Sequence, residues 1–284
     1  MKTIQISHTK PRFVITFILF MTAINSSLYS QDADYIELNK NHKDTMTNKM
    51  KIEIWSDIAC PFCYMGKRKF EIALSQFPDK EFIDVEWKSF QLNPELKTDT
   101  SISIYTYLSE IKGYEITQAK QMTGNIVQAG KEVGLDYHFD QIVVANTFKA
   151  HCLLHFAKKQ GKQTETKERL LNAYFSEGRN MDDIPTLISL AEEIGLNTDH
   201  LLETLENESN AEEVRFDFYE AGQLGIRSVP FFVFDRKFAI SGAQDPSVFL
   251  QSLQKSFAEW RKTNPSASFE VLQGQSCTPE GKCD

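Results

Sequence analysis

The chain has 284 residues and a formal net charge of −8 at neutral pH, and hydrophobic residues make up 41% of it. This length and composition are typical of a globular protein with a sizeable core, and they exclude a wholly disordered chain. The excess of acidic residues leaves no basic surface of the kind that nucleic-acid-binding proteins need, so we expect no nucleic-acid partner.

The N-terminal 30 residues have the pattern of a secretory signal peptide. Basic residues precede an apolar run over residues 13–24, and a small residue just before Gln31 offers a cleavage site. A run of about a dozen apolar residues is too short to span a bilayer comfortably, so we expect no stable membrane insertion. We predict a signal peptide over residues 1–30 and a polar linker over residues 31–49.

Export would place the protein in the periplasm or outside the cell, where an oxidising environment supplies substrates for a dithiol oxidase. The alternative is that translation begins at Met46 or Met50, because Met50 stands immediately before the first predicted strand. A protein that starts there would be cytoplasmic and would serve in redox defence. We favour export.

Two cysteines, Cys60 and Cys63, stand where a predicted strand gives way to a predicted helix. The apolar residues of 52–55 indicate a short buried strand, and those of 64–74 recur at helical spacing. Cys60 therefore stands at the start of a helix, with Pro61 at the first helical position. Free backbone N–H groups and the helix dipole at this end favour a thiolate, which predicts a lowered pKa for Cys60. Cys63, one turn later, can attack a mixed disulfide formed at Cys60.

Two other interpretations of the pair remain open at this point. Cysteines at this spacing can be buried and inert, or they can supply half of a zinc site. The position at a helix start favours dithiol redox chemistry, with Cys60 as the nucleophile and Cys63 as the resolving thiol. We expect no metal at this pair.

Residues 101–224 are predicted to be helical throughout. Apolar residues recur there at helical spacing in several stretches, and glycines supply the stops between them. His151 and Cys152 fall on one of these stretches, where a histidine is usually structural and a lone cysteine is usually a small core residue.

Residues 225–263 begin with a predicted hairpin and end with a predicted helix. Two apolar runs flank a polar break at Asp235 and Arg236, and Pro230 stands at the start of the first run. Proline is tolerated at the first residue of a strand, so an ordinary strand start explains Pro230 without any function.

A second cysteine pair, Cys277 and Cys283, lies in the tail over residues 264–284. Pro279 and Gly281 between them favour a tight turn, so a disulfide between the pair is sterically reasonable. A zinc site made of both cysteine pairs is the non-enzymatic alternative. The five-residue gap of the second pair and the helix-start position of the first weigh against it.

In combination these segments resemble the DsbA family of thioredoxin-fold proteins and, within it, the FrnE-like branch. The resemblance spans roughly residues 50–255 and rests on residues 55–67, 90–94, 146–151, 173–178 and 228–244. It implies an α/β thioredoxin fold with a large inserted all-helical subdomain. The first half of the thioredoxin fold would cover residues 50–100, the insertion 101–224, and the second half, with the hairpin and closing helix, 225–263.

The resemblance also implies roles that the residues alone do not assign. Pro230 would be a cis-proline that faces the two thiols and completes the catalytic set. The backbone of Val229 would pair with an extended segment of the substrate. The residues implied to bind substrate are Pro61, Phe62, Val229, Asn146 and His151, and Cys277 and Cys283 are implied to exchange electrons with the active site.

The predicted function is therefore thiol–disulfide exchange with protein substrates. The partners would be proteins with thiols or disulfides and an unidentified redox partner, with no cofactor beyond the redox-active disulfide and with glutathione as a candidate electron partner. The alternative is a glutathione-dependent isomerase of the hydroxychromene-carboxylate type. In that branch and in the kappa-class glutathione transferases, serine usually replaces the first cysteine, and the second is also absent. Because this chain keeps Cys60 and Cys63, we favour disulfide exchange; its direction, whether oxidation, reduction or isomerisation, is left open.

Overall fold

A four-stranded sheet forms the centre of the computed structural model, which describes residues 48–265. The strands lie in the order β2–β1–β3–β4: β1 is Met50–Ser56, β2 is Ile83–Ser89, β3 is Phe231–Phe234 and β4 is Phe238–Ser241. β1 pairs with β2 in parallel and with β3 antiparallel, and β3 pairs antiparallel with β4. This mixed sheet is the one that the predicted thioredoxin fold requires.

Two helices cover one face of the sheet. α2 (Pro61–Ser75) follows β1, α10 (Pro246–Thr263) closes the described chain, and the two helices contact each other. Phe70 of α2 and Phe249 of α10 both pack on Phe232 of β3, with ring centroids 5.6 Å and 4.6 Å away. Burial of these aromatic rings provides the main driving force for docking the two helices on the sheet.

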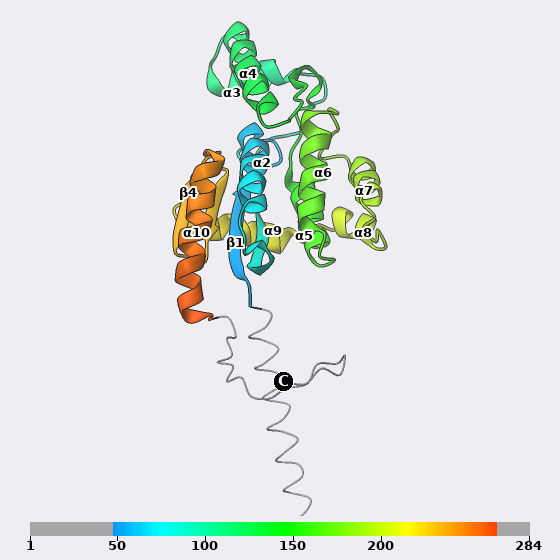
Figure 1. The fold of residues 1–284 in the computed structure, drawn as a ribbon. Coiled ribbons are helices and arrows are strands. Elements are labelled where there is room, and N and C mark those ends of the chain that lie inside the picture. The colour runs from blue at the N-terminus through cyan, green and yellow to red at the C-terminus, as the bar shows by residue number, and fades with distance from the viewer. Residues whose placement is uncertain (1–47, 266–284) are drawn as a thin grey trace, which may run out of the picture. The chain divides into compact units, whose positions relative to one another are not determined.

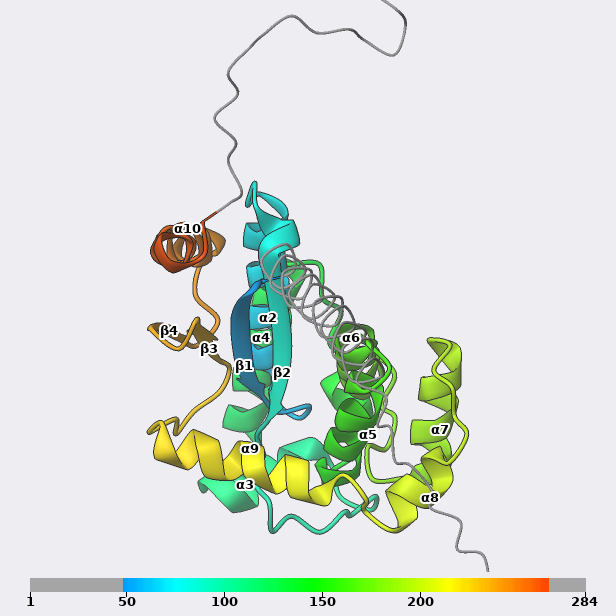
Figure 2. The ribbon, with the colours of Figure 1, turned by 90° about the horizontal axis from the view of Figure 1, so that it is seen from below.

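Seven α-helices lie between β2 and β3, in the segment where the sequence predicts an all-helical insertion. They are α3 (Ile104–Lys112), α4 (Ile116–Lys131), α5 (Phe148–Lys158), α6 (Gln163–Phe175), α7 (Ile184–Glu193), α8 (Leu201–Glu206) and α9 (Ala211–Gln223). α3 and α4 lie beyond the N-terminal end of α2, and α7 and α8 lie on the far side of α5 and α6 from the sheet (Figures 1 and 2). Short 3₁₀ turns at Lys80–Phe82 and Phe139–Gln141 complete the described secondary structure.

α2 contributes to two separate cores. Phe70 and Ala73 pack in the core between the sheet and α10. Tyr64 and Met65, on the first turns of the same helix, pack instead in the core of the inserted helices. The N-terminal end of α2 therefore packs on the inserted helices, and the following turns pack on the sheet and α10.

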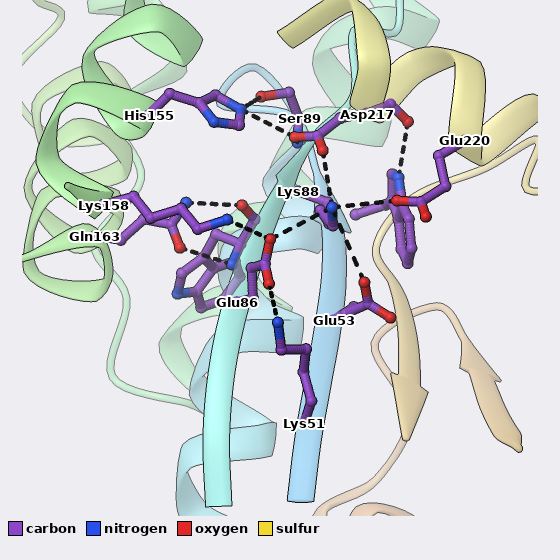
Figure 3. A network of polar contacts seen from close by, with 12 residues as sticks. Lys51, Glu53, Glu86, Lys88, Ser89, His155, Lys158, Gln163, Asp217 and Glu220 are labelled. Carbon is purple, nitrogen blue, oxygen red and sulfur yellow. Dashed lines mark hydrogen bonds and ion pairs between the residues drawn. The ribbon is translucent and has the colours of Figure 1, made fainter. Parts of the chain in front are cut away.

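A buried polar network joins the sheet to the inserted helices (Figure 3). Lys88 of β2 lies among four carboxylates, at 3.1 Å from Asp217, 3.1 Å from Glu220, 3.3 Å from Glu86 and 3.9 Å from Glu53. Burial opposes the charge on Lys88, but Asp217 and Glu86 raise its pKa above the ordinary value. The network fixes α9 against β2 and stabilises a cation that would otherwise be costly to bury.

No helix within residues 48–265 is long and apolar enough to cross a membrane.

Candidate active site

Cys60 is the N-cap residue of α2, and Pro61 occupies the first helical position, as the sequence predicts. The chain reaches this point directly from β1, so the motif stands at the carboxyl end of a central strand. Both Cys60 and Cys63 are free thiols and are 3% and 1% exposed. The structure thus describes the reduced form of the pair.

Pro230 lies beside Cys60, and the Val229–Pro230 peptide bond is cis. The thiol of Cys60 lies 3.7 Å from the carbonyl oxygen of Val229. Pairing of β1 with β3 explains this approach, because Trp55 near the end of β1 is the partner of Phe231 at the start of β3. The structure therefore brings Cys60 and Pro230 together although 170 positions separate them.

α2 approaches Pro230 closely at a glycine. A Cβ atom built on Gly66 would lie 2.8 Å from Cγ of Pro230 and 3.4 Å from the ring of Phe232. Only glycine leaves enough space at this position for the helix and the proline loop to be in contact.

A fully buried lysine, Lys167 of α6, lies behind the thiol pair. Its ammonium donates a hydrogen bond to the carbonyl oxygen of Ser56 over 3.2 Å, and it makes no ion pair within the described part of the chain. Burial lowers the pKa of Lys167 to about 8. Our reading of the sequence missed this residue. The sequence does contain a sign that Lys167 is buried. It falls on the same helix face as the apolar Leu170, Leu171 and Tyr174.

The two thiols form a hydrogen-bonded pair in which the first proton is lost more readily than the second. The hydrogen bond to Cys63 and burial raise the pKa of Cys60. Burial opposes charge on Cys63 as well, but the Cys60 thiol and the Lys167 ammonium lower its pKa. The prediction of a lowered pKa for Cys60 is therefore wrong. Burial and the hydrogen bond between the thiols act against charge on Cys60, whereas the Lys167 ammonium favours charge on Cys63.

Asp57 lies in the loop just before the motif and fixes it by hydrogen bonds. Its buried carboxylate accepts hydrogen bonds from the Leu92 amide over 2.8 Å and from the Thr147 hydroxyl over 2.9 Å, and it lies 3.4 Å from Nε2 of His151. Burial opposes the charge on Asp57, but His151 and these donors lower its pKa. The carboxylate thus fixes the loop between β1 and α2 against α5.

The structure gives Asn146 and His151 structural contacts rather than an open position. Asn146 accepts a hydrogen bond from the Phe148 amide over 2.8 Å and donates to the carbonyl oxygen of Leu96 over 2.7 Å, so it fixes the start of α5. His151 is fully buried, and burial lowers its pKa. Neither residue lines the cavity at Cys60.

A cavity of about 560 Å³ opens beside Cys60. Cys60, Pro61 and Phe62 line one side of it, whereas Cys63 does not. Phe62 is 48% exposed, which is unusual for so large an apolar side chain beside a buried motif. Cys60 is consequently the thiol that a ligand in this space would meet.

Cys152 is the third free cysteine of the described residues. Cys152 is buried in α5, and burial raises its pKa to about 12. Cys277 and Cys283 lie outside the described residues. Within residues 48–265, no group of three or more histidine, cysteine or acidic side chains is placed to hold a metal ion.

Comparison with known proteins agrees with the fold and adds a family. The family described as "DSBA-like thioredoxin domain" matches residues 51–254. The uncharacterised protein YwbO of Bacillus subtilis is 29% identical over 204 residues, which cover 71% of this chain and 94% of that protein. A crystal structure of a probable DsbA oxidoreductase from Streptomyces coelicolor is 34% identical, with a TM-score of 0.69, and the match covers 83% of this chain and 98% of that one.

More distant structures share the fold alone. The cytosolic disulfide reductase DsbM of Pseudomonas aeruginosa is 15% identical with a TM-score of 0.51, and the match covers 75% of this chain and 98% of that one. A 2-hydroxychromene-2-carboxylate isomerase is 12% identical with a TM-score of 0.53, over 76% of this chain and 100% of that one. The family match covers most of the chain, and the chain therefore belongs to the DsbA-like thioredoxin domain family.

Proposed function

We propose that the protein is a thiol–disulfide oxidoreductase in which Cys60 and Cys63 cycle between a dithiol and a disulfide. The observation that carries this proposal is the contact of the Cys60 thiol with the Val229 carbonyl at 3.7 Å, beside Pro230 and with Cys63 one helical turn away. Val229 directly precedes Pro230 and β3, and a backbone segment beside a reactive thiol lets an extended substrate segment pair next to it.

The proposed reaction has two steps. The Cys60 sulfur attacks a substrate disulfide, forms a mixed disulfide and releases one substrate thiol. Cys63 then attacks the Cys60 sulfur, which releases the second substrate thiol and leaves the Cys60–Cys63 disulfide. The substrate disulfide is reduced to two thiols as the protein pair is oxidised, and the reverse sequence oxidises substrate thiols.

The charges around the pair support different roles for the two thiols. Cys60 lines the cavity and meets the substrate, while Lys167 stabilises negative charge on Cys63. The hydrogen bond between the thiols lets Cys63 take the proton of Cys60 as Cys60 attacks. Lys167 then favours the return of Cys63 to the thiolate form that resolves the mixed disulfide.

The full-length protein should reduce insulin in the presence of a dithiol reductant, or oxidise a reduced model protein. Cys60→Ser should abolish both reactions, and Cys63→Ser should accumulate the mixed disulfide with the substrate, which is detectable by mass. Cys152→Ala, which removes a buried thiol outside the site, serves as the matched control and should retain activity. Full activity of Cys60→Ser would overturn the assignment of the attacking thiol.

Two further proposals concern parts of the chain outside the described residues. We propose that the protein is exported after cleavage before Gln31, which the N-terminal peptide of the mature protein tests. We also propose that Cys277 and Cys283 exchange electrons with the active-site pair, with glutathione as a candidate external source. Loss of turnover in a Cys277→Ser, Cys283→Ser variant, with the first turnover unchanged, would support that role.

A further inference from the structure

The cavity beside Cys60 is separate from the Val229 backbone at which a peptide substrate would pair. Neither Val229 nor Pro230 lines it. Its walls come instead from the inserted helices, with Tyr107 of α3, Met122 of α4 and Tyr174 of α6 among them. Figure 1 shows α3 and α4 beyond the end of α2 at which Cys60 lies. The inserted helices thus give Cys60 a second approach that the sheet does not provide.

Charge distinguishes this cavity from a site for glutathione. Asp57 is the only charged residue that lines it among residues 48–265, and its oxygens already accept hydrogen bonds from Leu92 and Thr147. In the described part of the chain no lysine, arginine or histidine lines the cavity, so a ligand carboxylate would meet no cation from these residues. A negatively charged thiol or disulfide would lose hydration on entry without a compensating ion pair.

The cavity nevertheless offers polar groups that can orient a neutral ligand. The Tyr174 hydroxyl makes no hydrogen bond to any residue between 48 and 265, and burial raises its pKa, so it remains a proton donor. The Tyr107 hydroxyl accepts a hydrogen bond from the Asn93 amide over 3.1 Å and keeps its own proton free. Two hydroxyl donors among mostly apolar lining residues suit an uncharged molecule with a weak acceptor, such as a heteroaromatic ring.

The volume of the cavity favours a small molecule as its occupant over a single side chain of a protein substrate. At about 560 Å³ the space is several times larger than one aromatic side chain and falls in the range of about 300–1,000 Å³ that is usual for small-molecule sites. An extended peptide held at Val229 would fill only a fraction of it.

We propose that the cavity binds an uncharged, largely apolar low-molecular-weight disulfide, which Cys60 and Cys63 reduce. This inference rests on the proposed dithiol function and names a substrate class for it. Cys60 attacks one sulfur of the bound disulfide, the disulfide bond breaks, and the first small thiol leaves. Cys63 attacks the Cys60 sulfur, the second small thiol leaves, and the protein ends with a Cys60–Cys63 disulfide. Two electrons pass from the protein dithiol to the ligand, and each released thiolate takes up one proton.

The test compares two chromogenic aromatic disulfides that differ in charge. Dithiodipyridine is neutral, and dithiobis(nitrobenzoate) carries two carboxylates. The rate constant for each reagent with the reduced full-length protein is divided by its rate constant with free mercaptoethanol at the same pH. The same chain with Cys60→Ser and Cys63→Ser supplies the background from the other three cysteines, which is subtracted. We expect the normalised rate of the neutral reagent to exceed that of the anionic one by at least about tenfold, because only the anionic reagent must bring a carboxylate into the cavity without gaining an ion pair.

A filled cavity provides a second test. Met122→Trp places a large ring in the cavity, and we expect the normalised preference for the neutral reagent to fall to about onefold to threefold. Gln121→Trp adds the same side chain at an exposed neighbouring position on α4 and should keep the full preference. Circular dichroism of both variants checks that they are folded, and the wild-type comparison stands without them.

The outcomes separate this inference from the function on which it rests. Equal normalised rates for the two reagents in wild-type protein, with insulin reduction intact, would overturn the substrate class alone. If neither reagent produced the Cys60–Cys63 disulfide, detected by mass as a loss of two hydrogen atoms, the proposed dithiol function would fail with it.

Discussion

The ammonium of Lys167 donates a hydrogen bond to the carbonyl oxygen of Ser56 over 3.2 Å, although the two residues are 111 positions apart. Through this contact a lysine of the inserted helix α6 places its positive charge at the end of β1, immediately before the thiol motif. The chemistry of the cysteine pair consequently depends on a residue of the insertion as well as on the thioredoxin fold.

Lys167→Met should make the thiols less reactive. Methionine fills a similar volume but removes the cation that lowers the pKa of Cys63, so less thiolate will be present at neutral pH. We expect the alkylation rate of the pair by iodoacetamide to fall by about tenfold at neutral pH and to recover at high pH. Lys131→Met, at an exposed position of α4, is the control and should leave the pH profile unchanged. An unchanged profile in Lys167→Met would show that the cation does not act on the pair.

Asp57→Asn should destabilise the protein in a pH-dependent way. An amide keeps one acceptor but cannot serve all the donors that meet the carboxylate, which costs about 1–3 kcal/mol at neutral pH. The pKa of Asp57 is lowered in the folded state from the ordinary 3.8, so its contribution is present above pH 3.8 and is lost as the pH falls through the folded value. Urea unfolding at several pH values should therefore show the two proteins converging in acid. A difference that stayed constant would contradict the assignment.

Gly66→Ala should strain the contact between α2 and Pro230. The new methyl group would overlap Cγ of Pro230 at 2.8 Å, and overpacking of this kind costs about 1–3 kcal/mol. Gly124→Ala is the matched control, because it lies within α4 with no atom within 4 Å of the new Cβ. It should stabilise the protein by about 0.5–1 kcal/mol. Thermal unfolding of the two variants should thus give shifts of opposite sign.

Lys88→Met should be the most damaging of these substitutions. Removing this cation leaves Asp217 and Glu220 buried beside each other and Glu86 with fewer partners (Figure 3). Breaking a buried ion pair by removing one partner costs about 3–5 kcal/mol. Because protonation relieves the repulsion between carboxylates, the loss of unfolding free energy should be smaller in acid than at neutral pH. A loss that did not depend on pH would point to packing as the cause.

Local sequence signals were sufficient to predict the position of the thiols and the hairpin. Pro61 follows Cys60 and is itself followed by apolar residues at helical spacing. This pattern predicts a helix that begins at Pro61 with Cys60 as its N-cap. The break at Asp235 and Arg236 likewise specifies a turn between two short strands. These features depend on neighbours in the chain, which is why periodicity and turn residues predicted them.

The electrostatics of the thiol pair could not be predicted in the same way. The pKa of Cys63 depends on Lys167, and the orientation of Asp57 depends on Thr147, and both partners come from the inserted helices. Which faces of α5 and α6 meet the sheet is decided by packing of the whole core. The helix N-terminus is the only one of these influences that is visible in the local sequence.

The pairing of β1 with β3 also sets the spacing between the two ends of the reaction centre. Trp55 pairs with Phe231. Cys60 follows Trp55 by a few residues, and Val229 precedes Phe231 by two. A slip of two residues along the strands would keep every side chain on its proper face but move Val229 by about 7 Å, well out of reach of the sulfur. Insertions or deletions within these two strands should therefore eliminate the proposed thiol exchange before they eliminate the fold, and the proposed chemistry depends on the strand register itself.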